Sequence, residues 1–339
     1  MGRMSLHTSY SASLIRSRYV YHYLSTALIL AVTLFASGCG ASGTIPTSGT
    51  PSGPSAPSAP SQNPSPVPST LTAKVVMVLE ENSAYEDVIG GSSMPYFNSL
   101  ATQGALATEY YADVHPSIGN YLMLTSGKME TVLDTSTDVF PDDNLARELK
   151  SAGKSWKVYA EDLPQAGYLG GDSGGYLRHH NPFAYYSDVV NDPAQAAKIV
   201  PLSQFASDLT AESLPDFSFV IPSAIHDGHD CVTPGCTGSD LLNAADQWLQ
   251  QNISPVLSNS QFSTNGLLLI LWDESQTLDV RHIGGRVALV AVGPRARSGA
   301  RSAVLYQHEN TLKTLCTVLG TTTCPGAGAS ATAETDLLK

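Results

Sequence analysis

The chain has 339 residues, of which 42% are hydrophobic, and carries a formal net charge of −12. This length allows a large core, and hydrophobic content of this size excludes a wholly disordered chain. The acidic balance, with no run of Lys or Arg, argues against nucleic acid as a partner.

The N-terminus has the pattern of an export signal. An apolar run, Leu24–Phe35, follows Arg16 and Arg18 and is too short to span a bilayer comfortably. It ends in Ala36-Ser37-Gly38-Cys39, which resembles the lipobox of bacterial lipoproteins, although Ala36 stands where leucine is commoner. We expect residues 1–38 to be a lipoprotein signal peptide and Cys39 to be acylated. The alternative is an ordinary secretory signal with an incidental cysteine.

The next segment, residues 39–70, is built from Ser, Pro, Gly, Thr and Ala without charge. Such a composition cannot bury a core and is typical of a flexible tether. We therefore expect a single domain over residues 71–339. It would be exported and held by its lipid anchor on a membrane, at the cell surface or in the periplasm.

Four further cysteines form two local pairs, Cys231 with Cys236 and Cys316 with Cys324. In an oxidising compartment, two small disulfide loops are the expected result. A zinc site at Cys231 and Cys236 is the alternative, but the pair lacks the two-residue spacing and a matching second pair.

From Lys74 onward, short β-rich apolar runs alternate with helical segments. This pattern predicts an α/β domain with a mostly parallel central sheet and helices on both faces. The expected strands are Val75–Leu79, Ala105–Tyr110, Trp156–Ala160, Phe217–Ile221, Leu267–Trp272 and Val287–Val292. The expected helices are Tyr96–Gln103, Ser117–Leu124, Asn144–Ala152, Ser239–Gln251 and Asn310–Leu319.

Metal-ligand residue types follow three of these strands, at the strand ends where open α/β sheets bind ligands. Carboxylates, an amide and imidazoles gathered at one sheet edge are what a divalent metal site needs. The residues are Glu80, Glu81 and Asn82 after the first strand, His226, Asp227, His229 and Asp230 after Phe217–Ile221, and Asp273 and Glu274 after Leu267–Trp272; His282 precedes the last strand.

Ser117 lies where a helix is expected to begin, and it has two interpretations. A serine at this position is commonly an N-cap. A helix N-terminus also stabilises negative charge, so the hydroxyl could instead be held as a metal-bound nucleophile. The sequence alone leaves both open.

The order of several motifs resembles a known family. Val78-Leu79-Glu80-Glu81-Asn82, the loop His115-Pro116-Ser117-Ile118-Gly119-Asn120-Tyr121 and Trp272-Asp273-Glu274 are similar to the bacterial phosphoesterase family of acid phosphatases and phospholipase C-type enzymes. That family lies within the alkaline phosphatase-like superfamily. The resemblance runs from about Lys74 to Leu319, and it implies an alkaline phosphatase-like fold and a hydrolase acting on phosphate esters.

The resemblance also implies roles for single residues. Glu81, Asn82, Asp273 and Glu274 would bind one divalent metal ion, with Ser117 as the nucleophile bound to it. Asp227, His229 and His282 match the positions that build a second metal site, so one or two ions are expected. Asn120 would bind a phosphoryl oxygen. Asp273-Glu274 replaces the commoner Asp-His pair, which favours a harder metal than zinc and leaves its identity open.

Alternatives remain beside a metal-dependent acid phosphatase. One is a phospholipase C-type phosphodiesterase, and another is a non-catalytic surface lipoprotein that keeps the fold. The Ser117 loop lacks the sulfatase motif, which argues against sulfate esters as substrates. Gly171-Asp172-Ser173-Gly174-Gly175 matches the nucleophile elbow of α/β-hydrolases but lacks the strand and helix around it, which predicts a surface loop. His179 and His180 are either solvated turn residues or contacts of the substrate pocket.

Overall fold

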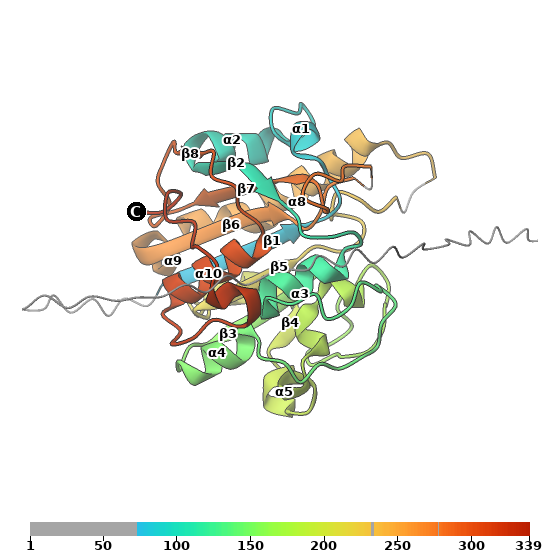
Figure 1. Ribbon diagram of the computed structural model, residues 1–339, viewed down its shortest axis with the longest axis vertical. Coiled ribbons are helices and arrows are strands. Elements are labelled where there is room, and N and C mark those ends of the chain that lie inside the picture. The colour runs from blue at the N-terminus through green and yellow to red at the C-terminus, as the bar shows by residue number, and fades with distance from the viewer. Residues whose placement is uncertain (1–72, 232–233, 277) are drawn as a thin grey trace, which may run out of the picture. The chain divides into compact units, whose positions relative to one another are not determined.

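One eight-stranded sheet, in the order β4-β3-β5-β1-β6-β7-β2-β8, organises the domain (Figure 1). The computed structural model describes residues 73–231, 234–276 and 278–339. The strands are β1 (Lys74–Glu80), β2 (Ala105–Tyr111), β3 (Trp156–Ala160), β4 (Ile199–Pro201), β5 (Phe217–Ile221), β6 (Gly266–Trp272), β7 (Arg286–Val292) and β8 (Arg301–Ser302).

The sheet is mostly parallel, as predicted. β1 pairs in parallel with β5 and β6, while β7 is antiparallel to both β6 and β2. In the register of β1, Val78 lies beside Val220 of β5 and beside Ile270 of β6. The three strands therefore end at the same edge, and the residues that follow them meet there.

Helices cover the sheet in two groups (Figure 1). The first group is formed by α3, α4 and α10, which contact one another, and the second by α8 with its neighbours α2, α7 and α9. The bounds are α2 (Pro95–Gln103), α3 (Ile118–Ser126), α4 (Leu145–Ser151), α7 (Ser203–Thr210), α8 (Gly238–Ser258), α9 (Ser260–Asn265) and α10 (His308–Leu319); the shorter helices are α1 (Tyr85–Val88), α5 (Ser187–Val190), α6 (Pro193–Ala196), η1 (Arg178–His180), η2 (Pro182–Tyr185) and η3 (Gly326–Ala329).

The helix ends follow the signals in the sequence. Asn144 caps α4 by accepting a hydrogen bond from the Arg147 amide, and Gly127 ends α3 in the left-handed conformation. The longest helix, α8, begins with a capping box between Thr237 and Asp240. It continues to Ser258, beyond the predicted end at Gln251, even though Pro255 lies inside it.

The central strands are buried on both faces. Every residue of β6 is buried, and so are the last six residues of β1. Trp272, at the end of β6, packs edge-on against Phe97 of α2 with 4.8 Å between ring centroids. This packing positions Trp272, the residue directly before Asp273.

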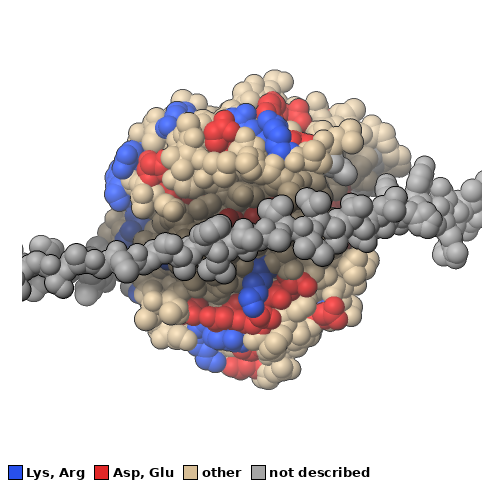
Figure 2. All heavy atoms as spheres, in the orientation of Figure 1, with Lys and Arg blue, Asp and Glu red and all other residues tan. Residues whose placement is uncertain are grey.

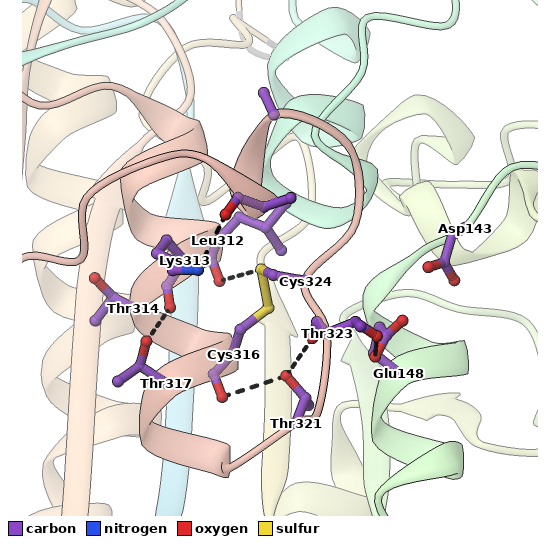
Figure 3. The surroundings of a disulfide bond; sticks show 12 residues. Asp143, Glu148, Leu312, Lys313, Thr314, Cys316, Thr317, Thr321, Thr323 and Cys324 are labelled. Atoms are coloured by element: carbon purple, nitrogen blue, oxygen red, sulfur yellow. Dashed lines mark hydrogen bonds between the residues drawn. A yellow bond between two sulfur atoms is a disulfide. The ribbon is translucent and has the colours of Figure 1, made fainter. Parts of the chain in front are cut away.

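Both predicted disulfides are present, Cys231–Cys236 and Cys316–Cys324. The second joins the last turn of α10 to the segment that follows it, where Thr323 donates a hydrogen bond to Glu148 of α4 (Figure 3). It therefore fastens the C-terminal segment to α10, with α4 alongside.

Two short edge strands, β4 and β8, were not predicted. At three and two residues they are too short to show a pattern in the sequence. The prediction of a surface loop at 171–175 is confirmed, because Ser173 and Tyr176 form a tight turn with two mutual backbone hydrogen bonds. The signal peptide of residues 1–38, the tether of residues 39–70 and Cys39 lie outside the described residues.

Candidate active site

Ser117 occupies the position just before α3, but its side chain does not cap the helix. Its backbone is helical, with φ −49° and ψ −52°, and its hydroxyl forms no capping hydrogen bond. The Ile118 amide donates instead to Asp134 Oδ1 at 3.1 Å. The side chain of Asp134 satisfies this amide, and the Ser117 hydroxyl is available for other contacts.

Three oxygen ligands surround that hydroxyl. Ser117 Oγ lies 3.0 Å from Glu81 Oε2 and 3.2 Å from Glu274 Oε1. Asn82 Oδ1 is 3.4 Å away. We call Glu81, Asn82, Ser117 and Glu274 the Ser117 cluster, and all its members except Asn82 are buried.

The pairing of β1 with β6 brings the cluster together. Glu80 lies beside Trp272 in the register, so the next residues, Glu81 and Asp273, leave the sheet side by side. The Asp273 amide donates to the Glu80 carbonyl at 2.9 Å, and the Asn82 amide donates to Asp273 Oδ1 at 3.1 Å. Asp273 thereby fixes the backbone turn that carries Asn82.

The segment that follows β5 is hydrogen-bonded to the end of β1. The Glu81 amide donates to the Asp227 carbonyl at 2.8 Å. Asp227 is itself buried, and its Oδ1 accepts hydrogen bonds from the His229 and Asp230 amides. The ends of β1, β5 and β6 thus meet as the sequence predicted.

Buried carboxylates of like charge are the main electrostatic feature. Burial, followed by repulsion from Asp273 and Asp227, raises the pKa of Glu81 well above its usual value. Burial and the Glu274 charge raise the pKa of Asp273, and burial raises that of Asp227 to about 7. One oxygen each of Asp227 and Asp273 is buried without a hydrogen-bond partner. These three carboxyl groups therefore lack a positive charge that would offset their mutual repulsion.

The donors suit a hard divalent cation. Among the described residues, no Lys or Arg forms an ion pair with Glu81, Asp273 or Glu274. In the same part of the chain, no three His, Cys, Asp or Glu side chains are grouped so that they could hold a metal ion by themselves. The Ser117 cluster instead offers two carboxylates, an amide oxygen and a hydroxyl. An all-oxygen set of this kind fits Mg²⁺, Ca²⁺ or Mn²⁺ better than zinc.

Two histidines and a tyrosine touch the cluster, and of these the sequence had offered only His180 as a contact of the substrate pocket. His115 Nδ1 pairs with Glu274 Oε2, and this hydrogen bond raises the pKa of His115. On the other side, His180 Nε2 lies 3.1 Å from Glu81 Oε1, and the Tyr121 hydroxyl donates to the same oxygen at 2.6 Å. The rings of Tyr121 and His180 are stacked. Tyr121 follows Ser117 by four residues on α3, a spacing that could have flagged it.

Two predicted site residues lie elsewhere. The Asn120 amide is buried and bonds to the loop before it: its oxygen accepts from the Asp113 and Val114 amides, and its nitrogen donates to the Val114 carbonyl. These bonds hold the Ser117 loop. His282 is exposed, and its ring packs on Tyr111 with 4.3 Å between centroids. In the described ranges, neither side chain forms a hydrogen bond or an ion pair with the Ser117 cluster.

A cavity of about 680 Å³ opens beside the cluster. Asn82 and His229 line it, together with the loop before α2 and the start of α8. The exposed imidazole of His229 thus shares a space with one cluster residue, and the cavity has room for a phosphate ester next to Asn82.

Residues 91–320 match the Phosphoesterase family. The chain belongs to the phosphoesterase family. It is 33% identical over 305 residues to a phosphatidylinositol-3-phosphatase of Mycobacterium tuberculosis, covering 89% of each chain. It is also 29% identical to a probable acid phosphatase of Kluyveromyces lactis over 70% of this chain, although that alignment spans only 55% of the fungal protein.

Solved structures share the fold of this phosphoesterase. A member of the alkaline phosphatase superfamily from Vibrio parahaemolyticus aligns with a TM-score of 0.55 at 14% identity, over 78% of this chain and 71% of that one. The phosphonate monoester hydrolase of Agrobacterium radiobacter aligns with a TM-score of 0.51, also at 14% identity, over 78% of this chain and 77% of the hydrolase. The chain therefore has an alkaline phosphatase-like fold. Its membership of the phosphoesterase family makes it a hydrolase that acts on phosphoric ester bonds. Its described helices include none long and apolar enough to cross a membrane.

Proposed function

We propose that this phosphoesterase is a metal-dependent, acid phosphatase-like phosphomonoesterase in which Ser117 is the nucleophile. The observation that carries the proposal is the contact of the Ser117 hydroxyl with Glu81 at 3.0 Å and with Glu274 at 3.2 Å, without a capping bond. The carboxylates beside this hydroxyl can accept its proton, and the helix N-terminus favours the negative charge that develops on the oxygen as it attacks.

The reaction has two halves. Ser117 Oγ forms a bond to phosphorus while the bond from phosphorus to the ester oxygen breaks, and the proton lost by the hydroxyl leaves with the alcohol. Water then attacks the phosphoserine, which releases phosphate and restores the hydroxyl. The partial positive charge at the start of α3 favours the negative charge that gathers on Ser117 Oγ and on the phosphoryl group.

A hard divalent cation would be held by Glu81, Asn82, Asp273 and Glu274. When bound, it would supply the positive charge that lowers the pKa of the Ser117 hydroxyl and offsets the charge of the phosphate. Its charge would also relieve the repulsion among Glu81, Asp273 and Glu274. Asp227 and His229 remain the residues from which a second ion could be bound, with His282 the least supported because it lies on Tyr111.

His115, His180 and Tyr121 act as positioning residues in this proposal. His180 and Tyr121 hold one oxygen of Glu81 and leave the other, Oε2, to face Ser117. His115 pairs with Oε2 of Glu274, while Oε1 accepts hydrogen bonds from both Asn82 Nδ2 and Ser117 Oγ. Asn120 keeps the loop in place. These contacts orient Glu81 Oε2 and Glu274 Oε1 towards the hydroxyl.

Relatives named as acid phosphatases and as a phosphatidylinositol-3-phosphatase support monoesters as substrates, including the headgroup phosphates of lipids. A phospholipase C-type diesterase is the second candidate. A non-catalytic lipoprotein would be expected to have lost the nucleophile or its neighbours, whereas all four members of the Ser117 cluster are kept. Export and anchoring through Cys39 complete the proposal, which places the domain on the outer side of a membrane.

The test combines metal content with turnover. The purified protein should contain close to one divalent ion and should hydrolyse an aryl phosphate monoester faster than the matching diester. Acid quenching during turnover should trap phosphate on the peptide that contains Ser117, as detected by mass spectrometry. A protein that turns over quickly with no phosphoserine at any time point would contradict the covalent mechanism.

A further inference from the structure

The loop between β6 and β7 exposes three large apolar side chains. Leu278 is 96% exposed, Val280 71% and Ile283 65%, which are the three highest values among the large apolar residues of the described chain. Single exposed apolar residues are ordinary, but three within six positions of one loop call for a partner.

Hydrogen bonds and ion pairs hold the part of this loop around Asp279 and Arg281. The Asp279 carboxylate accepts hydrogen bonds from the Arg286 amide at 3.0 Å and from the Arg281 side chain. Arg281 also pairs with Glu86 of α1 at 3.0 Å, so its charge is already neutralised by two carboxylates. At the neck of the loop, the Ser275 amide donates to the Gly284 carbonyl at 3.0 Å. Residues 279–286 therefore form a hydrogen-bonded frame beside the apolar side chains, with little net charge.

Ile283 has an unusual backbone conformation in the same loop. Its φ is +77°, a left-handed conformation that β-branched residues rarely adopt. A glycine or asparagine would relax this strain, and the exposed side chain gains little burial in return. Strain of this kind persists where a side chain serves a role outside the fold.

The loop is continuous with the active site. It starts directly after Glu274, and the His115 ring that pairs with Glu274 through Nδ1 lies 3.0 Å from the Asp279 carbonyl through Nε2. A surface docked on Leu278, Val280 and Ile283 would thus be brought to the edge of the sheet where Ser117 lies.

We propose that Leu278, Val280 and Ile283 insert into the surface of a phospholipid bilayer and deliver lipid-borne phosphate esters to the Ser117 cluster. This inference rests on the proposed function and adds the docking partner. Leu, Val and Ile are the residue types that favour hydrocarbon, and binding through them requires no basic patch, which agrees with the net charge of −12.

The predicted anchor allows this docking. Residues 40–72 separate Cys39 from the start of the domain, and a chain of this length reaches roughly 100 Å when extended. β1 begins at Lys74, at the sheet edge opposite the cluster, and its seven residues span roughly 20 Å. The tether is therefore long enough for the loop to touch the membrane that holds the anchor.

The test uses Leu278→Trp in the full chain, reconstituted with phosphatidylcholine vesicles whose acyl chains carry bromine, a quencher of tryptophan fluorescence at short range. The native tryptophans, Trp156, Trp248 and Trp272, are buried and should stay unquenched. Val304→Trp is the matched control, because Val304 is 49% exposed and lies outside the loop. We expect strong quenching for Leu278→Trp alone. Absence of quenching, or equal quenching at both positions, would overturn the proposal.

A second measurement separates docking from chemistry. In Leu278→Ser combined with Val280→Ser, we expect hydrolysis of phosphatidate embedded in phosphatidylcholine vesicles to fall by about tenfold or more, because two apolar anchors are removed. Hydrolysis of a soluble aryl phosphate should be unchanged. An equal loss on both substrates would contradict the docking role, whereas a wild-type protein without aryl phosphatase activity would instead refute the proposed function.

Discussion

The Ser117 hydroxyl lies 3.0 Å from Glu81 Oε2, although 36 positions separate the two residues in the sequence. Glu81 follows β1 and Ser117 precedes α3, so the contact exists because β1 and β2 both end at the same edge of the sheet. Since Asp134 takes the amide at the start of α3, the contact is independent of helix capping. Stability and catalysis should therefore be separable at this position.

Ser117→Ala and Ser117→Asp should both lower kcat by about 10⁴-fold or more, because the hydroxyl that attacks phosphorus is absent from both variants. Ser117→Ala should unfold at nearly the same temperature as the wild type, since no capping bond is lost. Steady-state kinetics with an aryl phosphate and thermal melts check the two parts.

Asp134→Ala is the control for the helix start. It should reduce the free energy of unfolding by about 1 kcal/mol through loss of the bond to the Ile118 amide, while most of the turnover is retained. If Ser117→Ala instead melts like Asp134→Ala and stays active, Ser117 is a structural residue only.

Asp273→Asn should have opposite effects on stability with and without metal. In excess chelator the variant should be more stable than the wild type, because it removes one of the buried charges that raise the pKa of Glu81. With Mg²⁺, Ca²⁺ or Mn²⁺ added, the wild type should gain more stability than the variant, because it has one more carboxylate to bind the ion. Melting temperatures across a metal titration provide the measurement. Equal gains in both proteins would remove Asp273 from the ligand set.

Much of the fold could be predicted because the central strands are continuous apolar runs. Leu267–Trp272 and Val287–Val292 are buried on both faces, and such strands are recognisable without any alternation of polar residues. The reversed direction of β7 could not be read from its own sequence, because a buried run looks the same in either direction. The short loop from β6 to β7, which lacks a crossover helix, carries that information.

The carboxylates of the site were predictable from the strands that precede them. Glu81, Asp273 and Glu274 were found because strand ends are the place to look. His180 could not be found in this way, since it comes from a 3₁₀ helix whose position depends on tertiary packing, including the stack on Tyr121. Asn120 was assigned to the substrate by resemblance, yet its three hydrogen bonds go to the backbone of residues 113–114. A side-chain amide next to a nucleophile can hydrogen-bond to the backbone of its own loop as well as to a substrate, and the sequence does not distinguish the two.

Cys39→Ala should shift the full-length protein from the detergent phase to the aqueous phase when export is driven by another signal. The reason is the proposed acyl chain on Cys39, which supplies most of the membrane affinity. Phase partitioning and intact mass check this prediction. A wild-type protein recovered in soluble form, cut at a different site, would remove the anchor.

Glu334→Gln should alter the pH dependence of stability. Glu334 is fully buried, with one oxygen accepting from Thr311 at 2.6 Å and the other without a partner, and burial raises its pKa to about 7. Below pH 4.5 the carboxyl is protonated in both folded and unfolded chains, so it imposes no ionisation cost. As pH rises towards 7, Glu334 ionises in the unfolded state before it ionises in the folded state. The free energy of unfolding of the wild type therefore falls by about 3 kcal/mol. Glu334→Gln has no carboxyl group to ionise and should not show this decrease. In urea denaturation, the free energy of unfolding of the variant relative to that of the wild type should therefore increase from pH 4.5 to pH 7 and then level off.

Replacing Cys316 and Cys324 by Ala should reduce the free energy of unfolding and leave the chemistry intact. The disulfide closes a loop with a sequence separation of 8, for which chain entropy alone corresponds to about 2.5 kcal/mol. It lies in the last turn of α10, whereas the site-facing end of that helix begins at His308, whose ring contacts the Asp273 carbonyl. Urea denaturation under oxidising conditions should show the loss, and kcat below the transition should match the wild type. Adding a reductant should then destabilise the wild type towards the variant; a variant that is as stable as the oxidised wild type would show that the bond contributes nothing to folding.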